Sequence, residues 1–456
     1  MNHPTTPGAT ASLRVRECVA YGLGDTATNL VWRTLMVFLG FFYTDVFGLS
    51  AAAVGTLLLV SRFSDGLSDV VMGVIADRTE TRWGKFRPWI LWTAVPFGVL
   101  TVLTFTTPDL GDTGKLVYAY LTYNALILVF TASNVPYSAM TGVMSADPGE
   151  RTRLSSYRFV GAFGGALLTQ GLNEPLVRWF GGGDATEGYR WTMVLFATVA
   201  VGFFLVTFAM TKERVKAVAT REPLQLRRDV ADLLRNRPWL VLFALGLCFV
   251  TITTLKQGST MYYFTYFLNS KALAGSYMVV GTVGALVGAA LTGRLVKWWG
   301  RRRVVLGALA IMGLSCAAMY AVGREGTALV FGLGLITEAA SGPVVTLFFS
   351  MLADAADFSE WKHRRRATGL VYSAGSLSFK FGSGVGGGLT GLVLASSGYA
   401  ANLEQTPSAL WGIKALMSVL PAVGCLVAFA AFWFYPLTDR KFAEIQAELA
   451  ERRGEA

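Results

Sequence analysis

Long stretches without a charged side chain constrain this sequence more than any other feature. Asp, Glu, Lys and Arg are all absent from residues 116–146, 191–211, 272–293 and 304–323. Each stretch could cross a bilayer as a helix, which needs about 20 mostly apolar residues. Charged residues make up only 15% of the chain, against about 25% in soluble domains. The sequence therefore predicts a polytopic membrane protein.

Eight further stretches bring the expected number of spans to twelve. Two of them are also free of charge, at 88–106 and 415–438. Six carry one to three charges each, at 18–44, 46–76, 154–177, 238–270, 326–353 and 367–403. The longest connection divides the spans six and six. The domains expected are an N-terminal bundle, a central cytoplasmic loop, a C-terminal bundle and a cytoplasmic tail, in residues 1–211, 212–237, 238–438 and 439–456.

The two halves share a glycine-containing basic turn. It reads Gly73-x-x-x-Asp77-Arg78 after the second span and Gly293-Arg294 after the eighth. Equivalent turns in both halves indicate an internal repeat. The fold class expected is therefore all-α, with twelve transmembrane helices in two pseudo-symmetric six-helix bundles. This arrangement is similar to that of the major facilitator superfamily.

The distribution of basic residues predicts the orientation. Of the 40 Lys and Arg residues, 29 lie in the N-terminal segment, every second loop and the C-terminal tail, whereas 5 lie in the opposite loops. Basic loops remain on the cytoplasmic side, so both termini are expected there, in an inner (plasma) membrane protein. The net charge of +11 then reflects this bias rather than a nucleic acid partner. No signal peptide is expected.

Metal and cofactor chemistry finds little support in the composition. The chain has two histidines, both outside the apolar stretches, and four scattered cysteines without a CxxC pair. This argues against haem and zinc and favours reduced, buried cysteines. A nucleophile with its base is also missing, so we expect no enzyme and no cofactor. The glycines of Gly382-Ser-Gly-Val-Gly-Gly387 are expected to allow close helix packing rather than nucleotide binding.

Two carboxylates in the second span give the strongest functional signal. Asp65 and Asp69 are spaced i, i+4 and share one helix face with Arg62. Two such close carboxylates favour a sodium ion between them or a proton on one of them. Asn134, beside Pro136 in the fourth span, is a further candidate cation ligand. An ion pair of Arg62 with one acid, and a simple kink at Pro136, are the structural alternatives.

Other polar residues within the spans are candidates for substrate binding, because buried charge is costly in a membrane. In the first span Tyr21, Asp25, Asn29 and Arg33 recur every four residues, as a sugar-binding stripe would require. Asp25 and Arg33 could instead bond to neighbouring helices. The remaining candidates are Arg158, Lys256, Glu338, Ser376 and Lys380. Lys256 and Glu338 could pair with each other and be purely structural.

Several motifs resemble those of the glycoside–pentoside–hexuronide:cation symporters, which include melibiose and xyloside permeases. The longest runs from Asp65 to Trp89, and shorter ones are Tyr21-Gly-Leu-Gly-Asp25, Phe42-Tyr-Thr-Asp45, Asn134-Val-Pro-Tyr137, Ser156-Tyr-Arg-Phe159 and Ala353-Asp-Ala-Ala-Asp-Phe-Ser-Glu-Trp361. The resemblance implies cation-coupled uptake of a sugar by alternating access, by a protein that usually acts as a monomer. It also implies that Asp65 and Asp69 hold the cation, and that Arg158 and Lys380 support the sugar cavity.

Three departures from the melibiose permeases affect the expected specificity. Asn134 and Asn29 stand where those proteins carry aspartates, and Ser138 stands where they carry a tryptophan. A xyloside-type glycoside is therefore favoured over melibiose, with Na⁺ or H⁺ as the coupling ion. The alternatives are a sodium-dependent lysolipid carrier of the same superfamily and, much less favoured, an intramembrane aspartyl enzyme.

Overall fold

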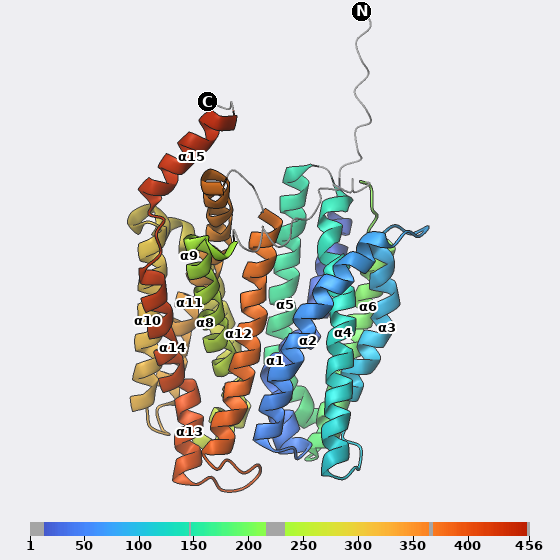
Figure 1. Cartoon of the computed structure of the whole chain (residues 1–456). Coiled ribbons are helices and arrows are strands. Elements are labelled where there is room, and N and C mark those ends of the chain that lie inside the picture. The colour runs from blue at the N-terminus through green and yellow to red at the C-terminus, as the bar shows by residue number, and fades with distance from the viewer. Residues whose placement is uncertain (1–12, 146, 216–232, 364–367, 454–456) are drawn as a thin grey trace, which may run out of the picture. The chain divides into compact units, whose positions relative to one another are not determined.

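The computed structural model describes residues 13–145, 147–215, 233–363 and 368–453 (Figure 1). These residues form helices joined by short connections, with one isolated bridge between Thr81 and Gly84. The predicted all-α fold is confirmed. Seven of the described helices are long and apolar enough to cross a membrane: α4 (Asp112–Met144), α6 (Ala185–Met210), α8 with η2 (Arg237–Phe267), η3 with α9 (Lys271–Trp299), α10 (Arg301–Ala321), α11 (Thr327–His363) and α13 with α14 (Pro407–Trp433).

Five further long helices occupy the remaining predicted spans. They are α1 (Val15–Phe41), α2 (Ala51–Arg78), α3 (Arg87–Thr104), α5 (Pro148–Gly181) and α12 (Thr368–Ser396). Several candidate site residues lie on these helices, namely Asp25 on α1, Asp65 and Asp69 on α2, Arg158 on α5 and Lys380 on α12. A final helix, α15 (Asp439–Arg453), follows the last span.

The chain forms two compact units, each described here by itself. The first contains residues up to Leu35 and Ser64–Arg221, and the second contains Met36–Phe63 and the rest of the chain from Glu222. Helices α1 and α2 therefore each pass from one unit into the other. In the first unit α3 packs on α4 and α6, and α5 packs on α6 (Figure 1).

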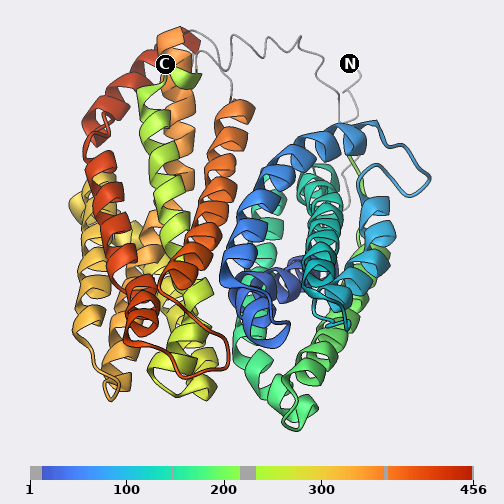
Figure 2. The same cartoon turned by 60° about the horizontal axis from the view of Figure 1, so that its bottom comes forward.

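In the second unit α8 packs on α12 and α14, and α11 packs on α9, α10 and α12 (Figure 2). Its core includes buried side chains from α8, α10, α11, α12 and α14, and from α15 through Ile445 and Leu449. The partly buried Leu295 and Val296 of α9 pack against this core. Cβ atoms at Gly382 and Gly386 would lie 2.6 Å from the Leu247 carbonyl oxygen and 2.7 Å from Thr254 Cβ. The expected role of these glycines in close helix packing is thus confirmed.

The cysteines are free, and three of them are buried: Cys18, Cys316 and Cys425. Cys248 is half-buried in α8.

Glu213, just after α6, holds the start of α3. Its carboxylate accepts hydrogen bonds from the backbone N–H groups of Lys85, Phe86 and Arg87 at 2.9, 2.7 and 2.8 Å. A negative charge at a helix N-terminus satisfies these otherwise unpaired donors. The preceding Gly84 has φ +117°, and a Cβ there would lie 2.5 Å from Glu213 Cδ, so only glycine fits.

Candidate functional site

The two carboxylates of α2 meet a hydroxyl of α4. Thr131 Oγ1 lies 3.3 Å from Asp65 Oδ1 and 3.3 Å from Asp69 Oδ1. Asp65 is only 1% exposed, and Ser68 donates to Thr131 at 3.4 Å. Side chains from both helices therefore bring three oxygen atoms together inside the first unit.

The Thr131 hydroxyl has a single proton to share between the Asp65 and Asp69 carboxylates, which limits the hydrogen bonds among these three oxygen atoms. The Thr131 hydroxyl can donate to Asp65 or to Asp69, but not to both. A monovalent cation among the three oxygens would neutralise the negative charge, and so would a proton on one carboxyl. These oxygens are the hard ligands that such cations prefer. The i, i+4 spacing thus does place both carboxylates on one face of α2.

Asn134 and Arg62 were also considered for this set, and each has a further contact. The Asn134 amide oxygen accepts a hydrogen bond from the Ser138 hydroxyl at 3.3 Å. Arg62 belongs to the second unit, where it donates to Met36 Sδ at 3.6 Å. The cation role of Asn134 stays a prediction.

An ion pair joins α1 to α5. Arg158 Nε lies 2.7 Å from Asp25 Oδ2, and Arg158 Nη2 lies 3.5 Å from Asp25 Oδ1. The side chains are 12% exposed for Asp25 and 23% for Arg158. Such a two-point contact fixes the plane of the guanidinium group. Of the two interpretations left open for Asp25, bonding to a neighbouring helix describes this conformation.

Two tyrosines complete the cluster. The Tyr137 hydroxyl on α4 lies 3.1 Å from Asp25 Oδ2 and also contacts the Tyr21 carbonyl oxygen. Tyr21 in turn donates to the Tyr137 carbonyl oxygen at 2.6 Å. The Arg158 guanidinium carbon lies 4.8 Å from the centre of the Tyr137 ring, a cation–π contact. Tyr21 is fully buried, so in this conformation it supports Asp25 and Arg158 rather than reaching a substrate.

Glycines let α1 and α5 approach closely enough for this ion pair. A Cβ at Gly161 would lie 2.1 Å from the Gly22 carbonyl oxygen, and one at Gly165 would lie 2.8 Å from that of Thr26. On α1, a Cβ at Gly24 would lie 2.5 Å from the Tyr137 ring. Small residues four apart commonly allow such contacts between membrane helices.

Exposed polar groups adjoin the buried ion pair. Arg158 Nη2 donates to the exposed Ser138 hydroxyl at 3.3 Å. The half-buried Asn29 uses its amide nitrogen to bond the Asp25 carbonyl oxygen at 3.0 Å. Together with Asn134 these groups offer donors and acceptors of the kind that sugar hydroxyls bind.

Lys256 and Glu338 form a second buried ion pair, between α8 and α11. Lys256 Nζ lies 3.0 Å from Glu338 Oε1, and the two side chains are 4% and 24% exposed. The Ser341 hydroxyl donates to the other oxygen of the Glu338 carboxylate, Oε2, at 3.5 Å. The pairing that the sequence left open is therefore present.

We expect removal of either Lys256 or Glu338 alone to destabilise the fold, and removal of both to be tolerated. Replacing Lys256 with Met leaves a half-buried carboxylate without its ammonium, which costs about 3–5 kcal/mol of stability. In Lys256→Met/Glu338→Met no charge remains, and most of the loss should be recovered. Thermal unfolding of the purified variants in detergent tests this. A double variant as unstable as the single one would contradict it, and a stable double variant without transport would assign the pair to the substrate.

The candidates on α12 differ in exposure. Ser376 is exposed and Lys380 is half-buried, one turn further along the helix. The Lys380 backbone carbonyl accepts from Ser383 at 2.9 Å. Their roles in substrate binding stay predictions.

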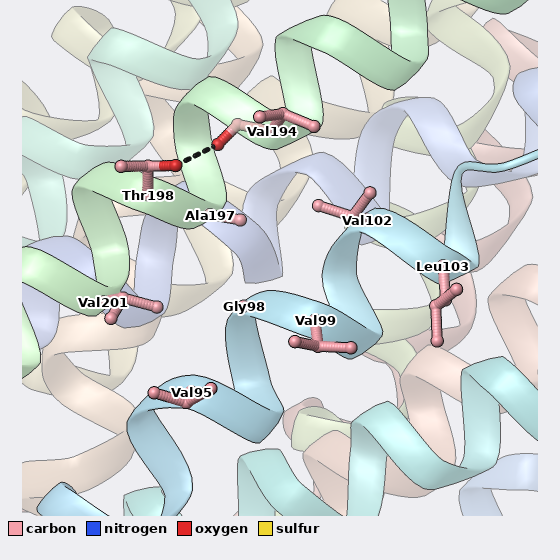
Figure 3. Close-up of a pocket in the computed structure, with 9 residues that line it drawn as sticks. All are labelled: Val95, Gly98, Val99, Val102, Leu103, Val194, Ala197, Thr198 and Val201. Carbon is pink, nitrogen blue, oxygen red and sulfur yellow. Dashed lines mark hydrogen bonds between the residues drawn. The ribbon is translucent and has the colours of Figure 1, made fainter.

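A groove of about 410 Å³ lies between α3 and α6 (Figure 3). Val95, Val99 and Val102 line it from α3, and Val194 and Val201 from α6. Its only hydroxyl belongs to Thr198, which donates to the Val194 carbonyl oxygen at 2.7 Å. A surface without free donors and acceptors does not suit a sugar, so the polar cluster remains the better site.

Membrane-spanning helices that enclose ion pairs and oxygen clusters define a multi-pass membrane transporter, and comparisons with known proteins agree. The family described as MFS/sugar transport protein matches residues 20–439. The chain belongs to this family, within the major facilitator superfamily, and it is not an enzyme. The predicted resemblance to the glycoside–pentoside–hexuronide:cation symporters is confirmed.

Curated relatives match along nearly the whole chain. The putative glycoside/cation symporter YagG of Escherichia coli (strain K12) is 37% identical over 442 residues, covering 97% of this chain and 96% of the relative. The isoprimeverose transporter of Lactiplantibacillus pentosus is 35% identical over 448 residues, covering 96% and 92%. The inner membrane symporter YicJ of Escherichia coli (strain K12) is 35% identical over 441 residues, covering 96% and 95%.

Solved structures share the fold at low identity. A bacterial homologue of the human lysosomal transporter Spinster, inward-facing and unoccupied, superposes with a TM-score of 0.69 at 16% identity, covering 95% of this chain and 99% of that one. The nucleoside transporter NupG gives a TM-score of 0.64 at 12% identity, covering 92% and 100%. These likenesses show the fold alone.

Sequence reasoning missed Thr131 as a partner of the carboxylates and Tyr137 as a partner of Asp25. A signal was present, because Thr131, Asn134, Ser138 and Thr141 follow one another at helical spacing in α4. That stripe places polar groups of both clusters on one face of a single helix.

Proposed function

We propose that this protein takes up a glycoside together with a monovalent cation by alternating access. The observation that carries this proposal is the oxygen set of Asp65, Asp69 and Thr131, whose charge one cation would neutralise. Relatives named as glycoside/cation symporter and isoprimeverose transporter support the substrate class. A xyloside-type glycoside, with Na⁺ or H⁺ as coupling ion, is the finer part of the proposal.

Helix α4 supplies a physical link between ion and sugar. Thr131 contacts the carboxylates, and Ser138, seven residues later on the same face, contacts Arg158. Seven residues of α-helix rise about 10 Å. A cation that draws Thr131 toward both carboxylates thereby shifts the helix that presents Ser138 and Asn134 to the sugar. Each ligand would then raise the affinity for the other.

The sugar would bind along the exposed edge of the Asp25–Arg158 pair. Arg158 is charged at every physiological pH, and its donors already reach Ser138. Asn29 is proposed as an additional contact in this unit. In the second unit Ser376 and Lys380 are proposed as sugar contacts, and Lys256 and Glu338 join α8 to α11. Asn134 is proposed as a contact to either ligand.

The remaining sequence-based expectations belong to the same proposal. The protein would act as a monomer in the inner membrane with both termini in the cytoplasm. Its rocking bundles would be residues 1–211 and 238–438. The cytoplasmic location of both termini is supported by the concentration of Lys and Arg in the terminal segments and in every second loop.

Gradient-driven uptake into proteoliposomes tests the proposal. Radiolabelled xylosides and galactosides would be offered with an inward Na⁺ gradient, an inward proton gradient, or neither. We expect accumulation of a xyloside above its external concentration with one of the gradients only. Equal uptake of every sugar without a gradient would contradict cation coupling, and uptake of a lysolipid in place of all sugars would contradict the substrate class.

A further inference from the structure

The first helix of each half of the chain ends in the same uncommon turn. Helix α1 continues into the π-helix η1 (Phe42–Val46), and α8 continues into the π-helix η2 (Tyr263–Phe267). Two residues after each π-helix comes a residue with positive φ, Gly48 at 80° and Asn269 at 52°. Short π-helical turns are rare and frequently lie at functional sites.

The hydrogen bonds of the two turns correspond one to one. In the first turn the Leu49 N–H donates to the Tyr43 carbonyl oxygen at 2.8 Å, and in the second Ser270 donates to Phe264 at 2.8 Å. By this correspondence Asp45 and Tyr266 occupy equivalent positions, the fourth residue of each π-helix. The internal repeat thus extends to these turns.

These two equivalent residues bind each other. The Tyr266 hydroxyl donates to Asp45 Oδ1, and the Tyr399 hydroxyl donates to Asp45 Oδ2 at 2.6 Å. Thr44 lies 2.5 Å from the same carboxylate, and Asp45 is only 9% exposed. A buried carboxylate needs such donors, because an unpaired charge at this depth is strongly unfavourable.

Asn402, in the loop after α12, forms hydrogen bonds with both Asp45 and Tyr266. The Asn402 amide nitrogen donates to the Asp45 carbonyl oxygen at 2.7 Å, and its backbone N–H donates to the Tyr266 hydroxyl at 2.9 Å. On the other side, the Thr44 hydroxyl lies 2.9 Å from that of Tyr262. The end of α1 is therefore held by residues that follow it by more than 200 positions.

The segment that these bonds hold belongs to the first half of the sequence. Residues Met36–Phe63 nevertheless form part of the second compact unit. If the two sequence halves rock against each other, these residues must leave the second unit once in every cycle. The bonds of Asp45 would then have to break and water would have to enter. A buried set of this kind has two discrete states rather than a continuous range.

We propose that Asp45, Tyr266 and Tyr399 form a latch that closes the extracytoplasmic end of the transport path. Its opening lets Met36–Phe63 separate from the second unit and admits the sugar. The assignment to the extracytoplasmic end rests on the proposed function, since that end lies between the first two spans of a chain with a cytoplasmic N-terminus. The latch acts on access and does not itself contact the cation.

Ala51 offers a reporter for the opening of the latch. It begins α2 and is 7% exposed. Its carbonyl oxygen would lie 2.5 Å from a Cβ at Gly391 of α12. A cysteine at this position should therefore react slowly with a membrane-impermeant maleimide while the latch is closed and quickly when it opens.

The test compares labelling rates of Ala51→Cys in intact cells, with the parent protein as background for the four native cysteines. We expect Asp45→Asn and Tyr266→Phe each to raise the rate about tenfold, as the loss of one strong hydrogen bond would. Tyr263→Phe is the matched control in the same π-helix, because the buried Tyr263 hydroxyl has no hydrogen-bond partner among the described residues. It should leave the rate within about twofold.

Three outcomes would overturn the latch. They are equal rates for Tyr266→Phe and Tyr263→Phe, labelling of Ala51→Cys only from the cytoplasmic side, and no response to Asp45→Asn. If Asp45→Asn does not accumulate in the membrane, Tyr399→Phe replaces it in the test. This variant keeps the hydrogen bond from Tyr266 to Asp45, and it should also raise the labelling rate. Labelling needs no sugar, so a responsive latch without any cation-driven uptake would leave the latch standing and refute the proposed function.

Discussion

Replacing Asp65 and Asp69 together with Asn should reduce gradient-driven accumulation of the glycoside by at least about 100-fold. The change removes both negative charges that the cation would neutralise but leaves the oxygen atoms that bond Thr131. Losing a charge-assisted contact in a low-dielectric site costs about 3 kcal/mol or more, which is a factor of about 100. Uptake driven by an imposed Na⁺ or proton gradient in proteoliposomes measures it.

Exchange should survive in the same variant. Counterflow of labelled against unlabelled sugar needs no net cation movement, so Asp65→Asn/Asp69→Asn should retain it if the sugar cluster is intact. Asp109→Asn is the matched control, since Asp109 is an exposed loop residue of the same unit. Undiminished accumulation by the double variant would refute the cation site, whereas loss of counterflow as well would show that the substitution had disrupted the bundle.

Breaking the Asp25–Arg158 pair should have the second large effect. In Asp25→Asn a guanidinium that is 23% exposed loses its carboxylate, and in Arg158→Gln a carboxylate that is 12% exposed loses its guanidinium. Leaving one partner of a mostly buried pair uncompensated costs about 3–5 kcal/mol. We expect each single variant to lower sugar uptake at least about 100-fold and to lower the unfolding temperature.

The double variant separates structure from sugar binding. Asp25→Asn/Arg158→Gln carries no uncompensated charge, so its unfolding temperature should return toward that of the parent, while uptake stays low because Ser138 has lost its donor. The control is the exposed pair Glu187–Arg190 of α6, at 3.2 Å, which is worth about 0–1 kcal/mol. Full uptake by the double variant would show that the pair is only structural.

The helices were predictable because membrane spans follow directly from the length of apolar stretches. Segments 116–146, 191–211 and 304–323 correspond to α4, α6 and α10. The π-helical ends of α1 and α8 were not predictable in this way. They depend on backbone hydrogen bonds that a hydropathy pattern does not report, and the expected first span accordingly included residues 42–44.

The site was predictable only where its residues lie on one helix. Asp65 and Asp69 are one turn apart, so their spacing alone brought them together. Thr131 comes from 62 residues further along the chain than Asp69, and Arg158 lies 133 residues from Asp25. Such pairs depend on which helix faces are turned inward, and helical periodicity does not determine that rotation.

Lys256 and Glu338 also lie on different helices, so the sequence alone could not determine whether they meet. The sequence left open whether Lys256 and Glu338 pair with each other or contact the substrate. The contact at 3.0 Å between α8 and α11 identifies the partner. Whether the pair also meets the sugar is tested by the variants described above, because packing and binding respond differently to removal of both charges.

Charge movement on a sugar concentration jump tests the central proposal of cation-coupled glycoside uptake most directly. Proteoliposomes would be adsorbed on a sensor, and xylosides and galactosides would be applied with and without Na⁺ at two pH values. We predict an inward positive current with a xyloside that requires Na⁺ or, failing that, falls as the proton concentration is lowered, and that is absent in Asp65→Asn/Asp69→Asn. The absence of a sugar-evoked current in every condition, or the same current in the double variant, would contradict it.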